Sequence, residues 1–143
     1  MAILRKAEAV WTGDLKSGRG EVSLGSGAYK GAYSFQSRFE NGTGTNPEEL
    51  IAAAHSGCFS MALSAALGKA GHTPRSVKTS AAVHLDKVGE GFGITRIQLT
   101  TEADVPGLSD AEFQTIAKAA KETCPVSKAL AATEIGLDAK LIS

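Results

Sequence analysis

The stretch between Leu50 and Gly68 contains no Asp, Glu, Lys or Arg. On its amino-terminal side, Asn46 can cap a helix, Pro47 suits the first helical position, and Glu49 completes a capping box with Asn46. The run 67–71, Leu-Gly-Lys-Ala-Gly, supplies a stop. A helix without a charged face has no side suited to water, so we expect one central helix that is buried on nearly all sides.

The length and the lack of charge of this helix are also typical of a membrane-spanning helix. At about 1.5 Å per residue, it is barely long enough to cross a hydrocarbon core of about 30 Å. It carries His55, Cys58 and several serines, and much of the rest is alanine. Membrane spans are richer in Leu, Ile and Val, so the sequence favours the central core helix of a protein with no membrane contact.

Alternating apolar and polar positions predict strands on both sides of the central helix. In one of them, Tyr33, Phe35, Ser37 and Phe39 face one side and polar residues face the other. In a later one, Ile97, Leu99, Thr101 and Ala103 share a face. The predicted strands cover residues 3–12, 19–25, 31–40, 77–87, 92–105 and 133–142.

Two more helices are expected near the carboxyl end. Ser109 and Glu112 form a capping box for a helix whose apolar face contains Phe113 and Ala117. Pro125 breaks this helix and starts a short one through Ala131. The predicted order, βββαββααβ, indicates a single α+β domain over residues 1–143 with mostly antiparallel strands.

The composition of the chain makes some classes of function less favoured than others. The chain has 15 Lys plus Arg, 15 Asp plus Glu and no basic stripe, so nothing favours nucleic-acid binding. Its amino-terminal residues lack the apolar segment and cleavage site of a secretory signal, and we expect a cytoplasmic protein. In a reducing cytosol, two cysteines are more often catalytic, metal-binding or incidental than a permanent crosslink.

Cys58 and Cys124, 66 positions apart, are the candidates for chemistry. A structural disulfide between them would be credited with about 4 kcal/mol by the loop-closure model, but a cytosolic chain rarely keeps one. The two thiols can also be independent packing residues, or, with His55 and a carboxylate, metal ligands. The fourth alternative is a redox pair, in which the two thiols are oxidised to a disulfide and reduced again during the reaction.

The surroundings of the two cysteines favour the redox pair. Cys124 precedes Pro125, where the first backbone N–H groups of a helix stabilise a thiolate. Cys58 lies in an apolar helix, and burial raises the pKa of a thiol. A reactive Cys58 therefore needs a cation, and Arg38 is the best candidate, although the pattern alone fits a solvated arginine equally well. His55, one turn before Cys58, is expected to be a buried core histidine rather than a residue that tunes Cys58.

Two motifs then point to a family. Residues 45–59, TNPEELIAAAHSGCF, and residues 124–127, CPVS, resemble the OsmC/Ohr family of bacterial peroxidases. The likeness extends over essentially the whole chain, including WTGD at 11–14 and FQSRF at 35–39, and it is closer to the OsmC branch.

The resemblance implies reduction of organic hydroperoxides by thiols without metal, flavin or haem, with hydrogen peroxide as a further candidate substrate. Cys58 would be the peroxidatic thiolate and Cys124 the resolving one. Arg38 and Glu48 match the Arg and Glu partners of the family, and Gln36 is expected to help line the substrate site. The implied fold is an intertwined homodimer with bent sheets around two central helices, reduced by an external dithiol.

Helix geometry adds that the active site is shared between subunits. Glu48 and Cys58 are ten positions apart, hence about 15 Å along one helix, so one small site can hardly use both from the same chain. Two functions of other classes remain as alternatives. One is a non-enzymatic binder of a small apolar ligand with packing cysteines, and the other is a redox-sensing regulator, for which the sequence offers no nucleic-acid surface.

Overall fold

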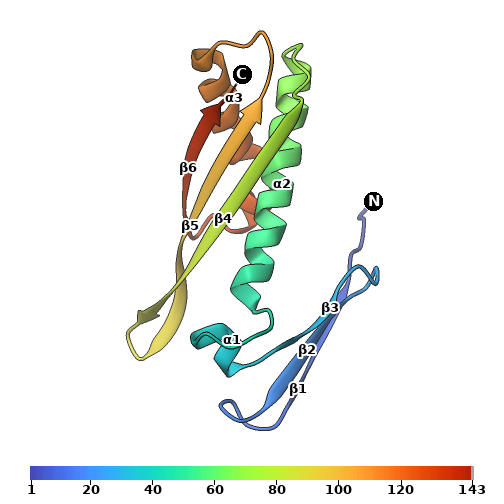
Figure 1. Ribbon diagram of the computed structural model, residues 1–143, viewed down its shortest axis with the longest axis vertical. Helices are drawn as coiled ribbons and strands as arrows, with labels where there is room; N and C mark the ends of the chain where they lie inside the picture. The colour runs from blue at the N-terminus through green and yellow to red at the C-terminus, as the bar shows by residue number, and fades with distance from the viewer. Residues whose placement is uncertain (143) are drawn as a thin grey trace. The chain divides into compact units, whose positions relative to one another are not determined.

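The computed structural model describes residues 1–142 as two compact units, one from Met1 to Leu50 and one that begins at Ile51. The elements follow the order β1, β2, β3, α1, α2, β4, β5, α3, α4, β6 (Figure 1). Each unit has its own three-stranded sheet. The α+β class and the predicted order are confirmed except for α1, while the assignment of one domain stays a prediction.

The amino-terminal unit contains β1 (Ala7–Thr12), β2 (Arg19–Leu24) and β3 (Lys30–Tyr33), which form an antiparallel sheet in that order. The first strand is shorter than the predicted 3–12, since residues 3–6 make no strand. The strands expose most of their side chains, and the buried residues of this unit are Gly20, Ser37, Thr45 and Glu48.

The predicted strand at 31–40 is wrong beyond Tyr33, because α1 (Phe35–Phe39) follows it. The Ser34 hydroxyl accepts a hydrogen bond from the Ser37 N–H at 3.0 Å, and the Ser37 hydroxyl accepts one from the Ser34 N–H at 2.8 Å. This reciprocal cap starts a helix where alternation had indicated a strand. Arg38 therefore lies in the last turn of a short helix.

The central helix α2 (Pro47–Lys69) begins and ends where the sequence predicts. The Asn46 side-chain oxygen accepts a hydrogen bond from the Glu49 N–H at 2.8 Å. The reciprocal half of the predicted capping box is absent from the hydrogen bonds of residues 1–142, where the Glu49 carboxylate instead accepts from the Thr45 hydroxyl at 2.8 Å. At the other end, the His72 N–H donates to the Leu67 carbonyl, and Gly71 has φ +89°, which closes a Schellman motif.

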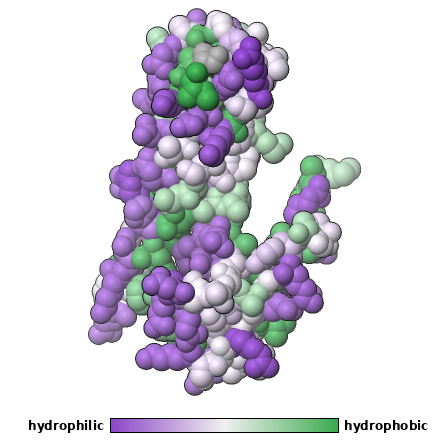
Figure 2. Space-filling model, viewed as in Figure 1, coloured by the Kyte–Doolittle hydropathy of each residue, from purple (hydrophilic) through white to green (hydrophobic). Residues whose placement is uncertain are grey.

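The sequence predicted that α2 is buried on nearly all sides, but in the single chain it is not. Only 22% of its most apolar window is buried. The buried side chains form one stripe: Glu48, His55, Phe59, Leu63 and Leu67. The exposed positions form another: Ala53, Ala54, Gly57, Met61, Ser64, Ala65 and Gly68. The surface over the middle of α2 is mostly white and pale green in Figure 2, so a weakly polar helix face remains uncovered.

The carboxyl-terminal unit contains β4 (Ser76–Val88), β5 (Gly91–Asp104) and β6 (Glu134–Leu141), with β5 in the middle of the sheet. β4 pairs with β5 as an antiparallel hairpin, and β6 joins β5 in parallel. Helices α3 (Asp110–Thr123) and α4 (Pro125–Ala129) separate β5 from β6. The Ser109 hydroxyl caps α3 by accepting from the Glu112 N–H at 3.2 Å, which is one half of the predicted capping box.

The hydrophobic core belongs to this second unit. The inward side chains of β5 are fully buried on the predicted face: Ile97, Leu99, Thr101 and Ala103. Ile97, Leu99 and Ala103 form one cluster with Phe59 and Leu63 of α2 and with Phe113 and Ala117 of α3. Helices therefore cover one face of the sheet, and this packing fixes α2 and α3 in the same core.

Candidate active site

The two cysteines meet in the carboxyl-terminal unit. Cys58 lies in the middle of α2 and is half-buried, while Cys124 is the residue before α4 and is fully buried. Both are free thiols that pack into the same core, and each thiol shifts the pKa of the other. Two groups far apart in the sequence are thus neighbours in the fold.

Their surroundings separate the two thiols electrostatically. Burial raises the pKa of the Cys58 thiol, and the hydrogen bond with Cys124 raises it further. Burial also opposes ionisation of Cys124, but hydrogen bonds outweigh it and lower the pKa: they come from the Cys58 thiol, the N–H and hydroxyl of Ser127, and the Val126 N–H. In the isolated chain, the first proton of the pair therefore leaves Cys124.

Arg38 and Glu48 form a bidentate ion pair in the amino-terminal unit. The Arg38 Nε and Nη2 atoms donate to the Glu48 Oε1 and Oε2 atoms at 3.0 and 2.8 Å. The carboxylate is 7% exposed, and the guanidinium lies 5.3 Å from the Phe39 ring centroid. The hydrogen bond to Glu48 raises the pKa of Arg38, so the guanidinium stays charged. Two contacts thus hold this cation in one orientation.

A small apolar cavity lies beside the guanidinium. Its volume is about 180 Å³, and its lining comprises Trp11, Leu15, Tyr33, Ser34, Phe35, Arg38 and Phe39. Gln36, which was expected to line the substrate site, is not among these residues. Its amide nitrogen instead donates to the Lys16 carbonyl at 3.0 Å. The role of Gln36 stays a prediction.

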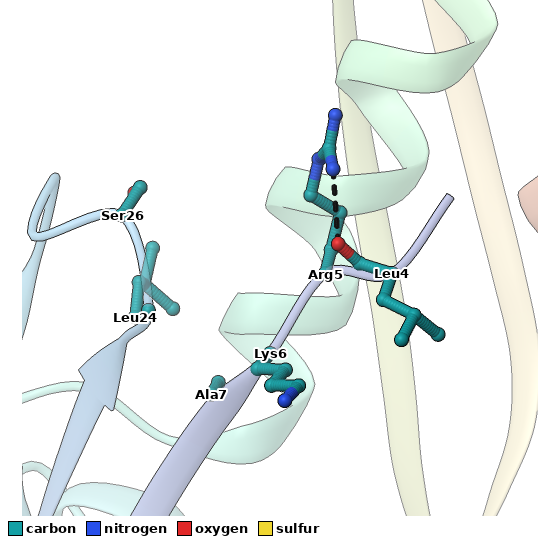
Figure 3. A pocket seen from close by; sticks show the side chains of 7 residues that line it. Leu4, Arg5, Lys6, Ala7, Leu24 and Ser26 are labelled. Carbon is teal, nitrogen blue, oxygen red and sulfur yellow. Dashed lines mark hydrogen bonds between the residues drawn. The ribbon is translucent and has the colours of Figure 1, made fainter. Parts of the chain in front are cut away.

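A larger cavity, of about 620 Å³, lies elsewhere in the amino-terminal unit (Figure 3). It is lined by Leu4, Arg5, Lys6, Ala7, Leu24, Gly25 and Ser26. The Arg5 guanidinium points back to the Leu4 carbonyl, to which it donates at 2.9 Å. This cavity contains none of the residues predicted for chemistry, so size alone does not identify the site.

The sequence did not predict the hydrogen bond of His55. Its Nε2 atom lies 2.8 Å from the Ser127 Oγ atom, and the imidazole is fully buried. Burial lowers the pKa of His55, so its ring is neutral at pH 7. The buried core histidine expected from the sequence is correct, but its partner lies 72 positions away, and no local pattern identifies such a partner.

The candidate site residues thus fall into two groups. The amino-terminal unit carries the cation, with Arg38 and Glu48, and the carboxyl-terminal unit carries the sulfurs, with Cys58 and Cys124. Within residues 1–142, no three His, Cys, Asp or Glu side chains gather as a metal-binding group.

The chain is similar to known proteins over its full length. The chain is 54% identical to "Peroxiredoxin OsmC" of Escherichia coli (strain K12) over 144 aligned positions, which cover all of both chains. The crystal structure of an organic hydroperoxide resistance protein from Elizabethkingia anophelis is similar with a TM-score of 0.69 and 25% identity, over 99% of this chain and 98% of that one. An OsmC-like protein from Mycoplasma pneumoniae shares the fold, with a TM-score of 0.77 at 15% identity over the whole of both chains.

The match to a family model covers the core of the chain. Residues 40–138 fit the model described as OsmC-like protein. This span includes the start of α2, both cysteines and most of the sheet of the carboxyl-terminal unit. The chain belongs to the OsmC-like protein family.

Proposed function

We propose that this chain reduces organic hydroperoxides through Cys58, with Cys124 as the resolving thiol and Arg38 and Glu48 as the group that activates Cys58. The thiol-peroxidase class follows from the full-length likeness to a peroxiredoxin and from two free thiols in one core. The observation that carries the proposal is that Cys58 packs against the core cluster that contains Cys124, where each thiol shifts the pKa of the other.

The chemistry proceeds in three steps. The Cys58 thiolate attacks one peroxide oxygen, the O–O bond breaks, and an alcohol leaves as Cys58 becomes a sulfenic acid. Cys124 then attacks the sulfenic sulfur, which forms a disulfide and releases water. An external dithiol reduces the disulfide by thiol–disulfide exchange. In the cytoplasm, the predicted location, the reducing environment keeps both thiols available.

The Arg38–Glu48 pair supplies a positive charge that stabilises the Cys58 thiolate. Since Cys58 has a raised pKa in the single chain, it needs a nearby cation to become the attacking thiolate. Lowering a thiol pKa from about 8.5 to about 6 raises the thiolate fraction at neutral pH only about 30-fold. Most of the catalysis must therefore come from orienting the peroxide and stabilising the departing oxygen, and the fixed guanidinium suits both tasks.

The cavity beside Arg38 indicates the substrate class. Aromatic and aliphatic side chains line it, and its one charged lining residue is Arg38. A volume of about 180 Å³ is below the 300–1,000 Å³ typical of drug-sized ligands. We therefore expect a compact alkyl or aryl group in the cavity and the peroxide oxygens at the guanidinium.

A second copy of the chain is the proposed cover for the exposed face of α2. Among residues 1–142, α2 is the one helix long and apolar enough to span a membrane, a property shared by core helices of soluble proteins. Its exposed face includes Ala54, Gly57 and Ser64, whose small side chains permit close helix approach. Antiparallel crossing of two such helices brings Glu48 of one chain towards Cys58 of the other, so each active site takes residues from both subunits. Sedimentation velocity should give a dimer at micromolar concentration.

Anaerobic thiol counting tests the function. One equivalent of cumene hydroperoxide should consume both thiols and leave a Cys58–Cys124 disulfide, identified by peptide mass mapping. The matched Cys124→Ser variant should stop at a Cys58 sulfenic acid that reacts with dimedone. Survival of both thiols in the wild-type chain would overturn the proposal and favour a non-enzymatic binder of small apolar molecules.

A further inference from the structure

His55 is the buried titratable group that the proposed peroxidase chemistry does not use. It is 0% exposed, one turn before Cys58 on α2. Its Nε2 atom is 2.8 Å from the Ser127 hydroxyl oxygen, while its Nδ1 atom is buried without a hydrogen-bond partner in the described chain. An apolar side chain would fill this position without leaving a polar atom unpaired, so the imidazole calls for an explanation.

Ser127 connects this imidazole to Cys124. It is the third residue of α4, the helix that begins directly after Cys124. Its backbone N–H and its hydroxyl are both among the groups that lower the pKa of the Cys124 thiol. Ser127 is 6% exposed, so water competes little for its hydroxyl. The Ser127 hydroxyl therefore bonds to the His55 ring on one side and favours the thiolate of the resolving cysteine on the other.

The proton position on His55 decides where the Ser127 hydroxyl points. A hydroxyl has one hydrogen, which it can donate either to the imidazole or to the sulfur. No acceptor pairs with Nδ1 in the described chain, and buried N–H groups without acceptors are rare, so the ring proton belongs on Nε2. Nε2–H then donates to Ser127 Oγ, and the hydroxyl hydrogen is left for the Cys124 sulfur.

We propose that His55 is a positioning residue for the resolving step: its Nε2–H fixes the Ser127 hydroxyl so that this hydroxyl donates to the Cys124 thiolate. The proposal rests on the peroxidase function above. In the step it serves, the Cys124 thiolate sulfur attacks the Cys58 sulfur of the sulfenic acid, the S–S bond forms and the S–O bond breaks. Cys124 is oxidised and the sulfenic sulfur is reduced. The departing hydroxide and the proton released when Cys124 ionised together make one water.

A matched pair of variants tests the role of the Nε2 atom. His55→Gln keeps an amide nitrogen near the Nε2 position, whereas the shorter side chain of His55→Asn cannot reach Ser127. Both are made in a Cys58→Ser background, where Cys124 is the sole cysteine. Ultraviolet absorbance of the thiolate against pH then reports the Cys124 pKa directly. We expect the pKa to rise by about one unit in His55→Asn and in Ser127→Ala, and to stay near the parent value in His55→Gln.

A kinetic readout in chains with both cysteines separates this role from simple packing. Cys58 sulfenic acid should form at the wild-type rate in all three variants. Its conversion to the disulfide at pH 7 should be about tenfold slower in His55→Asn and Ser127→Ala only, and raising the pH should restore it.

The outcomes distinguish the two proposals. If wild-type chain forms no disulfide, the peroxidase function fails. If the disulfide forms and the Cys124 pKa is the same in parent, His55→Asn and Ser127→Ala, the His55 proposal alone is overturned. Should His55→Asn not fold, Ser127→Ala and His55→Gln decide: an unchanged pKa in Ser127→Ala, or a raised one in His55→Gln, contradicts it.

Discussion

The two units of this chain differ in how they are stabilised. All twelve buried hydrophobic residues among positions 1–142, from Phe59 to Cys124, lie in the carboxyl-terminal unit. In the amino-terminal unit the buried residues are polar or glycine, and large apolar side chains such as Val10, Leu15 and Leu24 are exposed. The unit with the sulfurs therefore has a core of its own, whereas the unit with the cation lacks one.

This difference bears directly on the chemistry. The carboxyl-terminal unit by itself brings the two sulfurs together and favours ionisation of Cys124. The proposed reaction instead needs Cys58 to be the thiolate, although burial raises its pKa. The Arg38–Glu48 pair, whose guanidinium would lower that pKa, lies in the unit without a core. We infer that assembly with a second copy both covers the amino-terminal unit and activates Cys58.

The largest effect is expected from the sulfurs. Cys58→Ser should lower steady-state peroxidase activity at least about a thousandfold, because the attacking atom is lost. Cys124→Ser is the matched control, and one equivalent of hydroperoxide should still convert Cys58 to a sulfenic acid in it. If sulfenic acid forms in Cys58→Ser and not in Cys124→Ser, the two thiols have the opposite roles, as the pKa order in the isolated chain alone indicates.

Loss of the carboxylate that orients the cation should have the next largest effect. Glu48→Gln removes the charged bidentate partner of Arg38, and we expect kcat/KM to fall about 10- to 100-fold. Glu49→Gln is the control, because its exposed carboxylate bonds only to the Thr45 hydroxyl in the described chain. Steady-state kinetics with cumene hydroperoxide measure both. Equal losses in the two variants would show that the charge near the helix start matters, and that the pair with Arg38 does not.

Glycine substitutions sharpen the comparison at the exposed face of α2. A Cβ atom added at Gly57 or at Gly68 meets nothing within 4 Å in the single chain. Helix propensity alone would therefore raise the free energy of unfolding by about 1 kcal/mol in both Gly57→Ala and Gly68→Ala. If a second α2 packs closely at Gly57, this gain should appear only in Gly68→Ala, and Gly57→Ala should weaken the dimer. Urea unfolding and sedimentation check this, and equal stabilisation would argue against close helix contact there.

The smallest effect concerns pH. Burial lowers the pKa of His55 in the folded chain below its ordinary 6.5, so the unfolded chain binds a proton first as the pH falls. The free energy of unfolding should then decrease below about pH 6.5, with a slope of at most about 1.4 kcal/mol per pH unit from this group. His55→Gln should lose this part of the pH dependence. Urea unfolding at several pH values and one protein concentration measures it, and identical slopes would contradict the assignment.

Much of the fold follows from local signals in the sequence. The Asn46 cap, the Gly71 stop of α2, the Ser109 cap of α3 and the buried face of β5 were all predicted correctly. These features depend on residues close in sequence, whose chemistry the pattern reveals directly. The helix α1 was missed because alternation from Tyr33 to Phe39 imitates a strand, while two serine hydroxyls determine the outcome.

The site could be predicted only in part. The surroundings of the two cysteines favoured a redox pair and suggested Arg38 as the cation, whereas Glu48 and the separate roles of the two thiols came from a resemblance. Spacing alone does not identify these partners, since each pair joins residues ten or more positions apart. The bond between His55 and Ser127 depends on how α4 packs against α2, which periodicity does not specify. The exposed face of α2 could not be foreseen either, because an uncharged helix gives no sign of whether its own chain or another covers it.

Subunit mixing tests the central claim most directly. Two impaired variants, Glu48→Ala and Cys58→Ser, are unfolded and refolded together, with heterodimers confirmed by native mass spectrometry. If each site takes Glu48 from one chain and Cys58 from the other, a heterodimer has one intact site, and a random mixture should recover roughly a quarter of wild-type activity. Activity no higher than that of the separate variants, with heterodimers present, would contradict a shared site.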